Sequence, residues 1–265
     1  MANGTQQTQN DEENVASARK KSGSSKKAIL LVVWLVMLGG LIFWIKTVGD
    51  TGGPAFPGTA PKNVPARKLD AAILETQWPQ IVAHAAAPPR GNPAAQYTIA
   101  EFGDFQCPMC GKVYPVLESL LKKYPKQVNL IFLHRPFPQM HQWALPAGQA
   151  SEIAAAQGKF WPMYDTLYSN QDNLEPGYYS TYAEQVGLNK AQFKAAFDAG
   201  TGQSQMKVAS AFADSLNVQE TPTILLRNNT AKTVTIYIGT IGTKNANGSP
   251  QYPGVQSIAT NPPWK

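Results

Sequence analysis

The chain has 265 residues, 43% of them hydrophobic and 10% aromatic, which is enough for one core with an insertion but not for two clear independent domains. Half of its net charge of +6 lies within residues 1–46, so the remainder has no basic surface of the kind that binds nucleic acid. The two cysteines lie three positions apart, and one such pair cannot brace a fold of this size, which favours a chemical role.

The N-terminal region predicts a membrane anchor. Residues 1–27 are rich in Asn, Gln, Ser and Lys and are expected to be a disordered cytoplasmic tail. Residues 28–46 form the expected transmembrane helix, because Ala28 to Ile45 carries no charge and is long enough to cross a bilayer. Lys and Arg crowd its N-terminal side, so we expect a single-pass protein of the cell (inner) membrane whose domain is extracytoplasmic or periplasmic. A cleaved signal peptide is the competing interpretation.

A linker and then one folded domain are predicted after the anchor. Residues 47–66 are rich in Gly and Pro, as is typical of a spacer. Residues 67–265 are expected to form the domain, which opens with an amphipathic stretch at 69–87 that has the pattern of a helix. The elements that follow are a strand, a helix and a second, buried strand, at residues 97–102, 111–124 and 128–133.

The second half of the domain predicts a helical insertion. Residues 142–216 have a helical pattern, whereas residues 223–226 and 233–238 have the pattern of a hairpin. The order β-α-β, helical block, β-β describes an α/β sheet that carries the insertion. Aromatic residues at helical spacing are expected to pack in its core: Phe160, Trp161, Tyr164 and Tyr168. Residues 240–265 have no helical period, so one face of the sheet is expected to be less covered, or covered by residues 69–87.

The cysteine pair predicts thiol–disulfide exchange. Cys107 lies at the start of a predicted helix, where unpaired N–H groups and the helix dipole favour a thiolate. Pro108 suits the first helical position because its missing N–H has no partner there. Cys110 lies on the same helical face, close enough to form a disulfide with Cys107. A substrate thiolate would attack the oxidised pair and form a mixed disulfide at Cys107.

Half of a structural metal site is the alternative for two cysteines at this spacing. Zinc normally needs four ligands, and beyond the cysteines the chain offers only His84, His134 and His141 as histidine ligands. We therefore expect no metal and no cofactor. His134 and His141 flank a Pro-containing loop, and we expect them to be polar surface or capping residues rather than a proton shuttle.

Three segments in the same order resemble the DsbA-like branch of the thioredoxin superfamily. They are Ala100–Cys110 (AEFGDFQCPMC), Gln157–Trp161 (QGKFW) and Glu220–Thr223 (ETPT). Proteins of that branch have a helical insertion between the second and third sheet strands, where residues 142–216 lie in this chain. The resemblance implies a thioredoxin-like fold over about residues 95–240 and a thiol:disulfide oxidoreductase, which the predicted helix at residues 28–46 would anchor in the membrane.

The resemblance also implies roles for individual residues. Thr221 and Pro222 match a cis-proline loop that faces the cysteines and binds substrate backbone, the alternative being an ordinary proline at a strand start. Glu101 matches a buried acid that tunes the cysteines or relays protons to them, the alternative being a solvent-facing glutamate. Pro115 matches a helix-kinking proline. Met109, with Pro108, occupies the dipeptide by which family members vary their redox poise.

We therefore expect an enzyme that forms disulfides in cysteine-containing exported proteins and is regenerated by a membrane redox partner. A reductase or isomerase kept reduced by a membrane partner is the first alternative. A membrane-tethered metal-delivery or assembly protein without turnover is the second. The sequence leaves the direction of the redox chemistry open.

Overall fold

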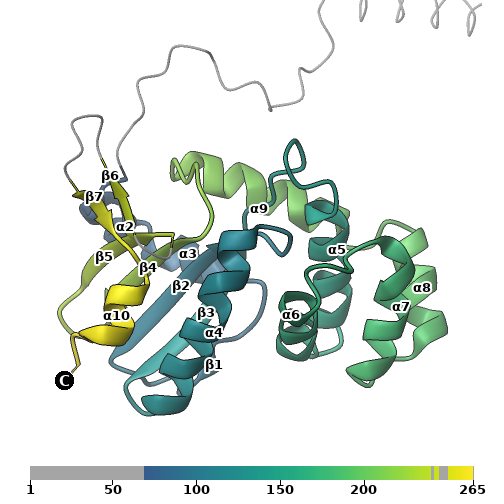
Figure 1. Ribbon diagram of the computed structural model, residues 1–265, viewed down its shortest axis with the longest axis horizontal. Coiled ribbons are helices and arrows are strands. Elements are labelled where there is room, and N and C mark those ends of the chain that lie inside the picture. Colours follow the sequence, from purple (N-terminus) through teal and green to yellow (C-terminus); the bar gives the residue numbers. More distant parts are fainter. Residues whose placement is uncertain (1–68, 240–241, 245–249, 265) are drawn as a thin grey trace, which may run out of the picture. The chain divides into compact units, whose positions relative to one another are not determined.

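A five-stranded sheet in the order β1-β3-β2-β4-β5 forms the centre of the domain (Figure 1). Its strands are β1 Arg90–Gly91, β2 Tyr97–Gly103, β3 Val128–His134, β4 Thr223–Asn228 and β5 Thr233–Ile238. β2 pairs in parallel with β3 and antiparallel with β4, and both outer pairs are antiparallel. Every residue of β2 and β3 is buried, as expected for central strands covered on both faces.

The computed structural model describes residues 69–239, 242–244 and 250–264, which belong to the unit Ala66–Lys265. The predicted tail, transmembrane segment and linker lie outside these residues. In the part of the chain that is described, none of the helices combines the length and apolar character that crossing a bilayer requires.

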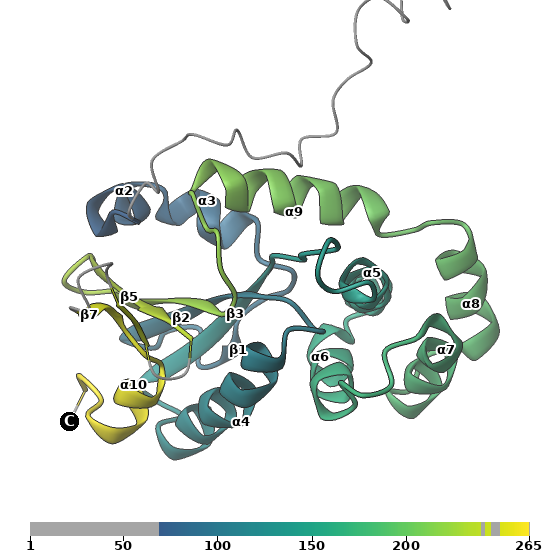
Figure 2. The same ribbon diagram turned by 45° about the horizontal axis from the view of Figure 1, so that its top comes forward.

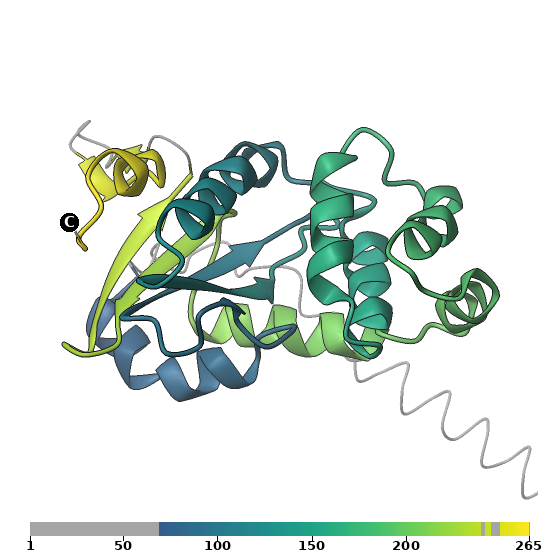
Figure 3. The same ribbon diagram turned by 90° about the horizontal axis from the view of Figure 1, so that it is seen from below.

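The helices divide between the two faces of the sheet (Figures 2 and 3). Helix α4, Pro108–Lys123, covers one face together with α10, Gln256–Thr260. The other face is covered by α2, Ala71–Thr76, and α3, Trp78–Ala83, together with the C-terminal end of α9, Gln203–Ser215. The prediction offered two alternatives, a less covered face or a face covered by residues 69–87 in place of a terminal helix; in the structure these residues cover the face opposite the one on which α10 packs.

The insertion lies between β3 and β4, as predicted. Its remaining helices are α5 Ala144–Ala155, α6 Phe160–Ser169, α7 Pro176–Gln185 and α8 Lys190–Asp198. They gather beyond one end of the sheet, and α9 then leads the chain back along it (Figure 1). The insertion shares one continuous core with α4 and the sheet, because side chains of α5 and α6 join the same buried cluster as those of β2 and β3.

The C-terminal segment differs from the prediction. Strands β6, Gly242–Lys244, and β7, Pro250–Pro253, pair with each other, and α10 follows them. Val255 and Ile258 are fully buried in the cluster that contains α4. A helix of five residues is too short for its periodicity to register in the sequence, so packing rather than local pattern determines it.

Replacing Ile81 tests whether α3 contributes to the core. Its side chain is fully buried against the sheet, so Ile81→Ala is expected to lower the free energy of unfolding by about 2–5 kcal/mol. The matched control is Ile73→Ala on α2, because Ile73 is 55% exposed and should change stability by about 0.5 kcal/mol or less. Denaturant unfolding followed by circular dichroism measures both, and equal effects would contradict the packing described.

Candidate active site

The two cysteines lie at the N-terminus of α4. Cys107 is the N-cap residue with extended backbone, Pro108 begins the helix, and the Gly111 N–H donates to the Cys107 carbonyl over 3.2 Å. Both cysteines are unpaired thiols, with Cys107 6% exposed and Cys110 fully buried. Cys107 is therefore the sulfur that a partner molecule can reach first.

The environment separates the proton affinities of the two sulfurs. A hydrogen bond from the Cys110 thiol lowers the pKa of Cys107 to about 5, helped by the Thr221 side chain and the backbone of Met109 and Cys110 and opposed by burial. Burial, the hydrogen bond to Cys107 and the charge of that thiolate raise the pKa of Cys110 well above its usual value. At neutral pH the pair is thus one thiolate and one thiol.

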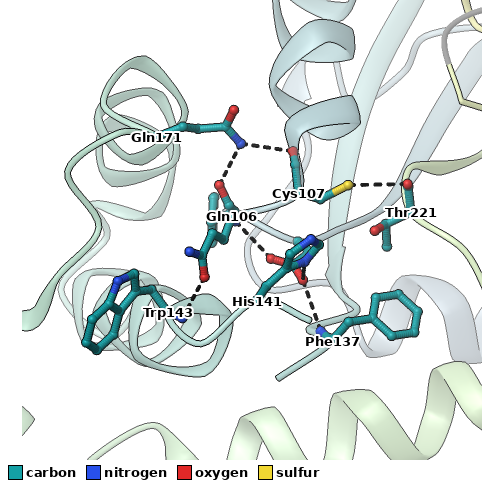
Figure 4. A network of polar contacts seen from close by, with 9 residues as sticks. Gln106, Cys107, Phe137, His141, Trp143, Gln171 and Thr221 are labelled. Atoms are coloured by element: carbon teal, nitrogen blue, oxygen red, sulfur yellow. Dashed lines mark hydrogen bonds and ion pairs between the residues drawn. The ribbon is translucent and has the colours of Figure 1, made fainter. Parts of the chain in front are cut away.

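The loop before β4 faces Cys107, as the resemblance implied. The Thr221–Pro222 bond is cis, and Cys107 Sγ lies 3.4 Å from the Thr221 carbonyl oxygen (Figure 4). Thr221 is half-buried and Pro222 is buried beside it. A residue 114 positions away in the sequence is thereby placed next to the reactive sulfur.

Glu101 lies inside the protein and interacts electrostatically with both cysteines. It is fully buried on β2, so the prediction that it faces inward is confirmed and the solvent-facing alternative is wrong. Tyr164 donates to Oε2 at 2.7 Å and Tyr168 donates to Oε1 at 3.2 Å. Burial raises the pKa of Glu101 to about 7, although the two tyrosine hydrogen bonds oppose the shift.

The aromatic residues of α6 therefore do more than fill the core. Phe160, Tyr164 and Tyr168 are buried as predicted, whereas Trp161 is half-exposed and its indole N–H donates to the Pro88 carbonyl at 2.9 Å. Tyr164 and Tyr168 direct their hydroxyls at a carboxylate. The sequence interpretation missed this, because helical spacing shows which side chains face inward but not which polar group they meet.

A polar network holds the loop that carries Cys107 (Figure 4). The buried Asp104 carboxylate accepts from the N–H groups of Gln106, at 2.8 Å, and Phe137, at 2.9 Å. Gln106 Oε1 in turn accepts from the Trp143 N–H at 2.6 Å. Gln171, which follows α6, donates from Nε2 to the carbonyls of Phe105 and Cys107, at 2.7 and 3.0 Å. Apart from Cys107, the sequence interpretation assigned none of these residues a role in the site.

Two histidines were predicted wrongly as surface or capping residues. His141 is half-buried, and its Nδ1 lies 2.8 Å from the same Asp104 carboxylate. His134 ends β3, is 4% exposed and lies 2.9 Å from Glu152 on α5. Both partners come from distant parts of the sequence, 37 and 18 positions away, which explains why the loop context misled.

The remaining predicted positions lie at the rim of the site. Pro108 is exposed and Met109 is half-buried, next to Cys107. Pro115 lies inside α4 and removes one helical hydrogen bond, as predicted. Within the described ranges, no group of three or more His, Cys, Asp or Glu side chains is arranged to hold a metal ion.

Comparisons with known proteins agree with this geometry. A family model described as Thioredoxin matches residues 85–235. The chain is 35% identical over 137 residues to a Na⁺/H⁺ antiporter of Salinispora tropica, covering 52% of this chain but 21% of that protein, so it spans about a fifth of that relative. Oxidised BdbD of Bacillus subtilis shares the fold with 24% identity, a TM-score of 0.50 and coverage of 56% of this chain and 84% of BdbD. The thiol-disulfide exchange protein alpha-DsbA2 of Wolbachia pipientis gives 14% identity, a TM-score of 0.52 and coverage of 63% and 89%.

The Cys107 thiolate makes a pH-dependent prediction. Because the pKa is lowered from 9.0 to about 5, alkylation of Cys107 by iodoacetamide should accelerate as pH rises through about 5. The same shift stabilises the reduced fold, an effect fully present above pH 9 and lost as pH falls through 5.

The source of that shift is tested by a matched pair of variants. In Cys110→Ala the alkylation midpoint should rise, since the largest favourable contribution is lost. In Cys110→Ser it should rise less, since a hydroxyl donor remains. A midpoint unchanged in both variants would exclude Cys110 as the cause.

Proposed function

The chain belongs to the thioredoxin family, and we propose that this protein disulfide oxidoreductase acts outside the cytoplasm as an oxidase, forming disulfides in exported proteins. The observation that carries the proposal is the hydrogen-bonded pair at the start of α4, in which Cys107 has a pKa of about 5 and Cys110 a pKa well above normal. Thiolate stabilisation acts on the reduced form alone, so it favours the reduced over the disulfide form and makes the disulfide an oxidant.

Exchange proceeds through two displacements. A client thiolate attacks Cys107 Sγ of the oxidised pair, the Cys107–Cys110 bond breaks, and Cys110 leaves as a thiolate that takes up a proton. A second client thiolate then attacks the client sulfur of the mixed disulfide. The client disulfide forms and Cys107 leaves as the thiolate that its surroundings stabilise, so the client loses two electrons and the pair gains them.

Two further groups assist these steps. Glu101 has a pKa of about 7 and interacts electrostatically with Cys110, so it can give a proton to the leaving Cys110 thiolate and recover it at neutral pH. Thr221 and Pro222 lie beside Cys107, where the exposed backbone of the loop can pair with an extended client segment. Met109 and Pro108, at the rim, face the same client.

The location and the partners are also part of the proposal. The uncharged run within residues 28–46 supports a single-pass anchor in the cell membrane, with the domain on the extracytoplasmic side. Such a compartment permits disulfides to persist. The reduced pair must pass its two electrons to an acceptor after each turnover, and a membrane redox partner is the class of protein that fits an anchored enzyme.

Trapping tests the assignment of the two cysteines. Incubated with a peptide that carries one disulfide, Cys110→Ala should accumulate a mixed disulfide through Cys107, because the sulfur that would displace the peptide is absent. Cys107→Ser should form none and should catalyse oxidation of reduced ribonuclease no faster than the buffer. Mass spectrometry before and after dithiothreitol identifies the adduct, and an adduct on Cys110 in Cys107→Ser would reverse the roles.

The direction of the reaction is tested by redox equilibrium with glutathione. An oxidase with a strongly stabilised thiolate should have a potential nearer about −120 mV than about −270 mV. Equilibrating the purified protein with glutathione mixtures and counting free thiols gives the value. A potential below about −250 mV would assign the protein to the reductases, the competing direction.

A further inference from the structure

We infer that Tyr164 and Tyr168, on helix α6 of the insertion, are positioning residues that hold the Glu101 carboxyl for proton exchange with Cys110. This role deepens the proposed function and rests on it. Neither tyrosine touches a cysteine sulfur through a hydrogen bond in the described structure, so both would act through Glu101.

The geometry fixes both oxygens of the carboxyl. Tyr164 donates to one oxygen at 2.7 Å and Tyr168 to the other at 3.2 Å. Both phenols are buried, and their ring centroids lie 4.8 Å apart in an edge-to-face arrangement. Phe132 packs on Tyr164 and Phe105 on Tyr168, with centroid separations of 5.3 and 5.0 Å. The two hydroxyls are therefore held in place by packed rings, and they hold the carboxyl in turn.

A missing side chain makes room for this contact. Gly103 lies two positions after Glu101 on the same face of β2. A Cβ at Gly103 would lie 2.4 Å from Phe132 Cε2 and 2.8 Å from the Tyr168 hydroxyl, both closer than such contacts allow, and 3.0 Å from Glu101 Oε1. The glycine thus leaves room for the Phe132 ring and for the Tyr168 hydroxyl beside Glu101.

In the described structure, the hydroxyls of Tyr164 and Tyr168 donate hydrogen bonds to Glu101, whereas its other neighbours carry like charge or no charge. On α4 and at its N-cap, Glu118 and Cys107 raise the pKa of Glu101 through like charge. The charge of Glu101 in turn raises the pKa of Cys110. The neighbouring strands place uncharged residues opposite it, Phe132 on β3 and Ile224 on β4. Burial raises the pKa values of both tyrosines well above normal, so both remain protonated donors at neutral pH.

These contacts assign the tyrosines a part in the proton step. When Cys110 leaves as a thiolate, Glu101 gives its proton to that sulfur. Glu101 then becomes a carboxylate that is buried away from water. Two phenol donors stabilise that carboxylate, because hydrogen bonds to charged acceptors are the stronger ones. The insertion thereby sets the proton affinity of the acid that serves a cysteine on α4.

The experiment compares Tyr164→Phe and Tyr168→Phe with the parent protein. Each variant keeps the ring and removes one hydroxyl, so the pKa of Glu101 should rise by about one unit, tenfold in proton affinity. Infrared difference spectroscopy follows the protonated carboxyl as pH is raised, with Glu101→Gln assigning the band. The pH midpoint of the Cys110-dependent step, displacement of glutathione from Cys107, should move in the same direction.

The matched control is Tyr182→Phe on α7. Tyr182 is also buried and donates to the Asn173 carbonyl at 2.7 Å, but it has no hydrogen bond to Glu101 among the described residues, so its loss should move neither midpoint. In a Glu101→Gln background, Tyr164→Phe should no longer change the pH profile of exchange. A purely structural role for the tyrosines would leave the carboxyl titration unchanged in both variants, and that result would overturn the inference.

The titration of the Glu101 carboxyl does not depend on turnover. The inferred role of the tyrosines can therefore be tested separately from the proposed function. A parent protein without exchange activity would contradict the proposed function, whereas the titration would still decide whether the tyrosines control Glu101. A shift in the titration of both tyrosine variants supports the inference. Equal shifts of the exchange midpoint with and without Glu101 overturn it.

Discussion

The stabilised sulfur anion at Cys107 is the feature on which the rest of the site depends. It lies at the start of a helix, accepts a hydrogen bond from the Cys110 thiol and remains slightly exposed, while Cys110 is fully buried. Burial alone would disfavour a thiolate, so the hydrogen bond within the pair has to outweigh desolvation. Burial first, and then the same hydrogen bond, raise the pKa of Cys110, so the two sulfurs have opposite protonation states at neutral pH.

The fold maintains this arrangement by holding the reactive loop from several directions. Asp104 ties the loop to the segment after β3, Gln171 ties it to the segment after α6, and the Thr221 carbonyl faces the sulfur from the start of β4. These contacts join the loop to segments of the insertion and of the sheet, so the insertion and the sheet define the site together (Figure 4). In the core, the hydrogen bonds from Tyr164 and Tyr168 to Glu101 likewise join the insertion to the sheet.

The parts of the site that could be predicted depend on residues that are close together in the sequence. The cysteine spacing and Pro108 specify the first turn of α4, and alternation along β2 turns Glu101 inward. The unpredicted parts were pairs of polar groups far apart in sequence. Tyr164 had a helical pattern that indicated burial without indicating a carboxylate 63 positions away. His141 stood in a loop whose context gave no sign of Asp104.

The sequence by itself determined the order of the main strands and helices from β2 to β5, the helical insertion and the two reactive cysteines, because hydrophobic period and helix-capping chemistry act between neighbours along the chain. Tertiary structure alone decided that α10 packs on α4, that α3 covers the opposite face, and that Glu101 meets Tyr164 and Tyr168. Electrostatics decided the proton affinities for the same reason: burial and partner contacts set a pKa, and both exist only after distant segments have come together.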